Sequence, residues 1–143
     1  MEPKSASRHI VPLIIGIIFA LAVGVFATGV GLDRNRAFYP TITIVIALLY
    51  VLFAVMGNST HALVVDSLVG AAFIIAATVG FKRSLWIVVV ALAGHGTMDL
   101  FHSAVIANPG VPTWWPAFCS AYDVVAAGYL AWLIRSGRVR AAT

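Results

Sequence analysis

Charged residues and cysteine are scarce in this chain of 143 residues. Only 10% of its residues are Asp, Glu, Lys or Arg, whereas soluble globular domains contain roughly 25%. The single cysteine, Cys119, excludes an internal disulfide bond and says nothing about redox compartment. The mean hydropathy is +1.01 and 62% of the residues are hydrophobic, which excludes a soluble globular protein and predicts a membrane protein.

Long apolar runs fill nearly the whole chain. A hydrocarbon layer of about 30 Å needs roughly 20 apolar residues in a helix. Five stretches come close to that length, and even the β-branched second one is predicted to be helical, because an isolated strand in lipid leaves its backbone unpaired. The sequence therefore predicts an all-α membrane bundle, a single transmembrane domain over residues 1–143 with helices at about 10–30, 41–56, 62–80, 85–106 and 116–134.

Basic residues are distributed unevenly between the predicted loops. With five spans, one side of the membrane carries only Lys4 and Arg8. The other side carries seven, namely Arg34, Arg36, Lys82, Arg83, Arg135, Arg138 and Arg140. Because cytoplasmic loops are enriched in Lys and Arg, we predict an external N-terminus and a cytoplasmic C-terminus. The same topology explains the pI near 9.7, so no nucleic-acid partner is expected.

Ionisable residues within the predicted helices gather at one level. At about 100° per residue, Asp99 lies roughly 40° and His102 roughly 20° from His95, so these three share one face of the fourth helix. The third helix carries Asp66 and the fifth carries Asp123 toward the same, outer end. We therefore expect one shared polar pocket near the outer leaflet.

No basic side chain is available within the predicted spans to neutralise these acids. A charged Asp at the bilayer centre costs about 2.5–3.5 kcal/mol on insertion scales. Protons, protonated His, a bound metal or a cationic ligand could supply the missing charge. His nitrogen and carboxylate oxygen suit zinc and non-haem iron or manganese, which predicts His95, Asp99, His102 and Asp123 as metal ligands. A desolvated Asp beside His could instead act as a general acid, and the sequence leaves both readings open.

A second stripe of polar residues lies on the fifth helix. Cys119, Tyr122 and Asp123 have i, i+3, i+4 spacing and share one face. Cys119 is expected to be a small buried hydrophobe, and Tyr122 is an interhelical hydrogen bonder, a proton donor, or neither. Both stripes have a structural alternative, in which they serve only to join helices.

Small residues repeat at four-residue spacing on the first helix. Gly16, Ala20 and Gly24 form a face that lets a partner helix approach closely. The partner is either another helix of the same chain or a second copy in a homodimer.

Three motifs occupy the segment from residue 80 to 123. They are Lys82-Arg-Ser-Leu-Trp86, His95-Gly-x-x-Asp99-x-x-His102 and Trp115-Pro-x-Phe-Cys119-x-x-x-Asp123. Together they resemble a family of small bacterial multipass membrane proteins, which implies a plasma-membrane location but no activity. The His95 motif is also similar to part of the zinc site of the alkaline ceramidase and adiponectin-receptor superfamily, intramembrane hydrolases with seven helices. Its first half looks like the His-x-x-x-Glu of the EXPERA sterol isomerase fold, where intramembrane acids handle carbocations.

These observations predict an intramembrane enzyme for a lipid or isoprenoid-like substrate. It would act by metal-assisted hydrolysis or by acid/base isomerisation or cyclisation, with catalytic roles for Asp99, Asp123, Asp66 and Tyr122. The expected partners are membrane lipid and a lipophilic small molecule, and the expected cofactor, if there is one, is zinc or non-haem iron or manganese. Two other functions stay open. One is a transporter or sensor of protons or divalent cations, and the other is a structural subunit that pairs with another membrane protein.

Overall fold

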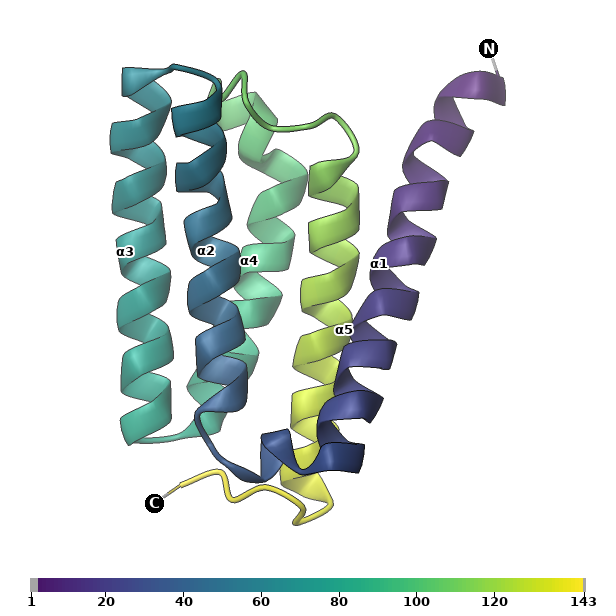
Figure 1. Ribbon diagram of the computed structural model, residues 1–143, viewed down its shortest axis with the longest axis vertical. Coiled ribbons are helices and arrows are strands. Elements are labelled where there is room, and N and C mark those ends of the chain that lie inside the picture. The colour runs from purple at the N-terminus through teal and green to yellow at the C-terminus, as the bar shows by residue number, and fades with distance from the viewer. Residues whose placement is uncertain (1–2, 143) are drawn as a thin grey trace.

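Five long helices make up nearly the whole of residues 3–142, the part of the chain that the computed structural model describes. They are α1 (Pro3–Val30), α2 (Phe38–Met56), α3 (Thr60–Lys82), α4 (Leu85–Val105) and α5 (Trp115–Arg135), with a short 3-10 helix, η1 (Leu32–Arg34), after α1 (Figure 1). Each of the five is long and apolar enough to cross a membrane. The predicted all-α bundle is confirmed, and the predicted bounds agree to within a few residues except that α1 begins earlier.

The helices begin where side chains satisfy their first free amides. Ser59 accepts a hydrogen bond from the amide of Ala62 at the start of α3, and Ser84 accepts one from the amide of Trp86 at the start of α4. Pro116 lies in the first turn of α5, where its missing N–H costs no helical hydrogen bond. These starts fix the ends of the three helices that carry the ionisable residues.

Helix α4 occupies the centre of the bundle. It packs against α2, α3 and α5, whereas α1 packs mainly against α5. Figure 1 shows α1 leaning away from the other helices toward its N-terminal end. The side chains that α4 buries are therefore enclosed by three neighbours.

The small-residue face of α1 packs within the chain. A Cβ atom added to Gly16 would lie 2.3 Å from the carbonyl oxygen of Phe118, and one added to Gly24 would lie 3.1 Å from the ring of Tyr129. Ala20, between them, is buried. The close contact predicted for this face is thus made with α5, and a homodimer through the same face stays a prediction.

Apolar side chains cover much of the surface between the two ends of the bundle. Leu68 and Val90 are 68% and 70% exposed, and Phe26 is similarly open. Apolar surface of this extent suits lipid rather than water. The arrangement of a soluble protein is thus reversed between the two ends of the bundle, where apolar side chains lie outside and ionisable side chains lie inside.

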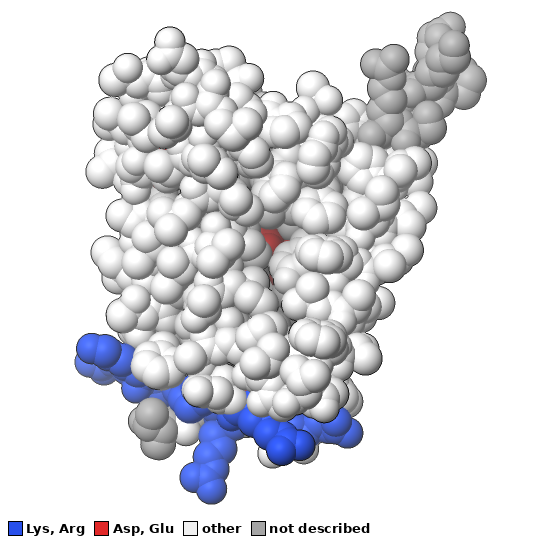
Figure 2. Space-filling view, viewed as in Figure 1, with Lys and Arg blue, Asp and Glu red and all other residues white. Residues whose placement is uncertain are grey.

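The Lys and Arg side chains that the structure describes gather at one end of the molecule, which we call the basic end (Figure 2). The α1–α2 and α3–α4 connections and the C-terminal segment lie there. Arg36 joins them, since its guanidinium donates to the carbonyl oxygens of Arg140 and Phe81 over 2.7 and 2.8 Å. This one-sided charge is the feature that predicts a cytoplasmic basic end.

Candidate functional site

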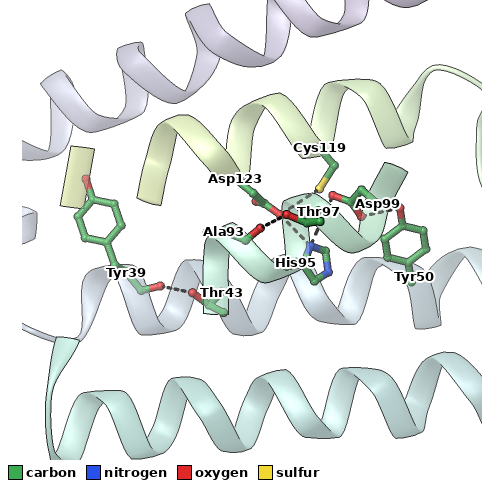
Figure 3. Close-up of polar contacts among 9 residues, drawn as sticks. All are labelled: Tyr39, Thr43, Tyr50, Ala93, His95, Thr97, Asp99, Cys119 and Asp123. Atoms are coloured by element: carbon green, nitrogen blue, oxygen red, sulfur yellow. Dashed lines mark hydrogen bonds and ion pairs between the residues drawn. The ribbon is translucent and has the colours of Figure 1, made fainter. Parts of the chain in front are cut away.

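Four side chains with metal-ligand chemistry converge inside the bundle. They are His95 and Asp99 on α4 and Cys119 and Asp123 on α5, and we call them the inner cluster (Figure 3). One ligand atom from each lies within 4.8 Å of all the others. All four residues are buried, and both Asp residues have no exposed surface.

Hydrogen bonds connect the members of the inner cluster, but they do not satisfy all of its carboxylate oxygens. His95 Nδ1 lies 2.7 Å from Asp123 Oδ2 and 3.5 Å from Asp99 Oδ2. The Cys119 thiol donates to Asp123 Oδ2 over 3.9 Å, and the Tyr50 hydroxyl donates to Asp99 Oδ1 over 2.7 Å (Figure 3). Among the described residues, Asp99 Oδ2 and Asp123 Oδ1 are buried without a hydrogen-bond partner. Such atoms are rare in native proteins, and a proton, an ion or a water molecule can satisfy them.

A glycine allows the two helices of the cluster to approach. A Cβ atom added to Gly96 would lie 3.0 Å from both the Cβ of Asp123 and the carbonyl oxygen of Ser120. On the opposite side, the ring of Phe73 from α3 packs edge-on to His95, with the centroids 4.8 Å apart. The imidazole is therefore enclosed between α5 and α3.

A second polar group lies further along α4, away from the basic end. His102 Nε2 is 2.8 Å from Asp66 Oδ1, and the side-chain amide of Asn108 donates to Asp66 Oδ2 over 2.7 Å. We call His102, Asp66 and Asn108 the second cluster. The Tyr50 ring stacks on His102 with centroids 4.0 Å apart, so Tyr50 touches both clusters.

The structure divides the predicted metal ligands between these two clusters. His95, Asp99 and Asp123 come together as the sequence predicts, and Cys119 joins them. His102 does not join them. It lies seven positions after His95 in the sequence, which corresponds to a rise of about 10.5 Å along a helix. Its side chain pairs with Asp66 instead, so these two predicted site residues lie outside the inner cluster.

The inner cluster extends from the middle of α4, at His95, toward the first turns of α5, at Cys119. His95 is ten residues from both Leu85 and Val105, the two ends of α4. Asp123 is eight residues from Trp115, where α5 begins, which corresponds to about 12 Å. The second cluster lies nearer than His95 and Asp123 to the helix ends away from the basic end, and a place near the outer leaflet stays a prediction.

An apolar cavity of about 250 Å³ adjoins the inner cluster, and we call it the lateral cavity. Helices α1, α2 and α5 line it with Phe19, Thr41, Ile42, Val45, Ile46, Leu49, Trp115, Phe118, Cys119 and Tyr122. Cys119 belongs to both the cavity and the cluster. Figure 2 shows acidic atoms at the bottom of a narrow hollow in the white surface.

Tyr122, one of the predicted catalytic residues, lines the lateral cavity. Its ring packs against Phe19 and Phe118, with centroid distances of 5.7 and 6.4 Å. Among the hydrogen bonds of the described residues, none involves its hydroxyl. Tyr122 is therefore placed to meet a molecule in the cavity rather than to hold the acids.

Two residues of the site escaped the sequence analysis. Tyr50 appeared only as part of an apolar run, although a lone hydroxyl in the middle of a spanning helix is a signal for a buried partner. Asn108 appeared only as part of a turn. Its contact with Asp66 joins residues 42 positions apart, which spacing does not reveal.

Comparison with protein-family models, with curated proteins and with solved structures finds no match. The resemblances drawn from the His95 and Trp115 motifs accordingly stay predictions. Chemically, imidazole, thiol and two carboxylates at this separation could hold a metal ion.

Proposed function

We propose that this protein is an intramembrane metalloenzyme. In this proposal the inner cluster binds one divalent cation, and the cation acts on a lipophilic molecule that enters from the bilayer through the lateral cavity. The proposal depends on one observation, the uncompensated negative charge of the cluster.

The charges of the inner cluster do not balance on their own. Asp99 and Asp123 carry two negative charges when ionised, and among the described side chains their only ion-pair partner is His95. A protonated His95 still leaves one negative charge in a dry site, which is costly. One divalent cation balances the two carboxylates when His95 is neutral, and coordination by Cys119 as a thiolate would add one negative charge. The cation would also give Asp99 Oδ2 and Asp123 Oδ1 the partner that they lack.

The residue types favour zinc over the harder cations. Imidazole and thiolate are typical zinc ligands, and two carboxylates complete a four-coordinate set. Neighbouring ligands of a tetrahedral zinc ion lie roughly 3.3–3.6 Å apart, given bonds of about 2.0–2.2 Å. His95 Nδ1 and Asp123 Oδ2, now 2.7 Å apart, would separate slightly, and the widest pairs, up to 4.8 Å, would close by about 1 Å.

The bound cation would supply Lewis-acid polarisation of an oxygen on the substrate. The chain itself supplies the orientation and the dry surroundings. Tyr50 fixes the Asp99 carboxylate by its hydrogen bond, as partners of metal ligands usually do. Phe73 and the α5 backbone hold the His95 ring and exclude water.

A second candidate function uses the same residues without a metal. The distance of 2.7 Å between His95 Nδ1 and Asp123 Oδ2 is that of a hydrogen bond, and it favours a shared proton. Asp99 and Asp123 would then form an acid/base pair, in which one protonates a carbon–carbon double bond and the other removes a proton elsewhere. The result is an isomerisation or cyclisation that needs no water.

Elemental analysis of protein purified in mild detergent tests the metal proposal. We expect about one zinc, iron or manganese per chain, and loss of most of it in Asp123→Asn. Asp33→Asn is a matched control, because Asp33 is also a buried acid but lies near the basic end, where it accepts a hydrogen bond from Thr28.

Two outcomes would contradict the metal proposal. One is a wild-type protein that holds no metal after incubation with Zn²⁺, Fe²⁺ or Mn²⁺. The other is equal metal content in the Asp123→Asn and Asp33→Asn variants. Turnover of a lipophilic substrate by metal-free protein, abolished by Asp99→Asn, would establish the acid/base candidate instead, and cation flux into liposomes would favour transport.

A further inference from the structure

The lateral cavity has walls of one chemical kind. Of its lining side chains, only Thr41, Trp115, Cys119 and Tyr122 carry a polar atom, and four aromatic rings from α1 and α5 contribute to its walls. Val45 on α2 forms part of the rim and is 53% exposed. An occupant of this cavity is therefore a hydrocarbon group, and its source is the lipid around the helices.

The depth of the site restricts where the occupant can react. Within the inner cluster, His95 and Asp123 lie about 15 and 12 Å from the nearest helix ends, and Asp99 and Cys119 lie about 9 and 6 Å from them, whereas half of a hydrocarbon layer measures about 15 Å. A phospholipid keeps its charged headgroup at the membrane interface, because charge at the bilayer centre is costly. The group that meets the cluster must then be carried within a hydrocarbon chain.

The size of the cavity restricts the number of chains. Its volume of about 250 Å³ is below the roughly 300–1,000 Å³ of common small-molecule pockets. A second apolar hollow, lined by Val11, Pro12, Ile15 and Trp114, shares Trp115 and Phe118 with it. One hydrocarbon chain can lie in the two adjoining hollows, along α1 and α5, with its end beside Cys119.

The aromatic walls favour an unsaturated chain. Phe19, Phe118 and Tyr122 lie in mutual contact, with ring centroids 5.7–6.4 Å apart. Trp115 joins them, 5.5 Å from Phe118. Flat double bonds and methyl branches contact such rings over a larger area than a mobile saturated chain does, and they lose less conformational freedom when bound.

From the walls, depth and size of the lateral cavity beside Cys119, we infer that the substrate is an uncharged, single-chain, isoprenoid-like lipid whose reacting group lies within the bilayer. This inference rests on the proposed function, since it names the substrate class of the same site. It excludes a two-chain phospholipid that would react at its headgroup.

Photolabelling of the whole protein in liposomes tests the inference. The probe is a prenyl alcohol with a diazirine on its chain, and the comparison probe is a phosphatidylcholine with a diazirine on its headgroup. We expect the prenyl probe to label the α5 segment with Trp115, Phe118 and Cys119, and an excess of unlabelled prenyl alcohol to reduce that labelling several-fold. The headgroup probe should leave this segment unlabelled.

A matched pair of variants locates the entrance. Val45→Trp places a bulky ring on the rim, whereas Val64→Trp makes the same change on α3 at a valine that is 55% exposed and does not line the cavity. We expect Val45→Trp to reduce prenyl labelling several-fold and Val64→Trp to leave it unchanged, with equal metal content in both.

The outcomes separate this inference from the proposed function. Labelling by the headgroup probe, or competition by phosphatidylcholine equal to that by prenyl alcohol, overturns the inference even when metal is bound. If unlabelled prenyl alcohol reduces the prenyl labelling of a protein that binds no metal, the substrate class is supported and the proposal of a metalloenzyme is overturned. The competition experiment uses the wild-type protein, so it decides the matter even if Val45→Trp fails to fold.

Discussion

Both polar clusters combine His with Asp, but they differ in how completely the hydrogen bonds of these side chains are satisfied. In the second cluster, one Asp faces one His, and both oxygens of Asp66 have partners in His102 and Asn108. In the inner cluster, two Asp residues face one His, and one oxygen of each acid has no hydrogen-bond partner among the described residues. Fully paired buried groups stabilise a fold, whereas two unpaired acid oxygens beside further metal-ligand atoms are typical of a place for a ligand. Both clusters contain His and Asp, so the balance of charge is what distinguishes the inner cluster, as a candidate site, from the second cluster, which only joins helices.

The largest expected effect is on metal content when one histidine of each cluster is removed. His95→Ala should lose most of the bound metal, because it removes a ligand of the inner cluster. His102→Ala should retain about as much metal as the wild type, since its ring contacts Asp66 and Tyr50 instead. Elemental analysis of the two purified variants measures this directly. Equal loss in both would mean that the clusters act as one site.

The next largest effect is on the free energy of unfolding. Asp66→Ala leaves His102 buried without its carboxylate, and breaking such a buried pair costs about 3–5 kcal/mol. Asp123→Asn in metal-free protein should cost far less, because it removes a charge that is already uncompensated. Denaturant unfolding in detergent micelles compares the two variants. A greater loss of stability in Asp123→Asn would reverse the roles that we assign to the clusters.

A smaller effect is expected from the hydroxyl that touches both clusters. Tyr50→Phe keeps the ring stacked on His102 but removes the hydrogen bond to Asp99, which should weaken metal binding roughly 10- to 100-fold. Tyr39→Phe is the matched control, since the buried Tyr39 hydroxyl has no hydrogen-bond partner and is not part of either cluster. Competition with a chelator gives the affinities. Equal affinities in the two variants would show that Tyr50 serves only to join helices.

The smallest effect concerns the thiol of the inner cluster. Cys119→Ser replaces a soft ligand by a hard one of similar size, so zinc affinity should fall more than manganese affinity. Titration of the metal-free variant with each ion measures the ratio. If both affinities stay at their wild-type values, Cys119 is the small buried hydrophobe that its sequence context suggests.

Sequence reasoning recovered the helices because lipid allows so few alternatives. Even the β-branched run of α2 had to be helical, since its backbone finds no other partners in a bilayer. It recovered His95, Asp99 and Asp123 because charge within a span is conspicuous. It grouped His102 with them because angular position on a helix ignores the rise along the axis. The membership of Cys119 and the bridging role of Tyr50 depend on how α2 and α5 pack around α4, which local spacing does not encode.

Gly16 gives the first helix an unexpected influence on the candidate site. At this residue α1 approaches the backbone of α5 so closely that even a methyl group would collide with the Phe118 carbonyl. Phe19, one turn later, forms a wall of the lateral cavity. The width of the lateral cavity thus depends on the absence of a side chain at Gly16. A larger residue at position 16 would push α1 away from α5 and widen the opening of the cavity.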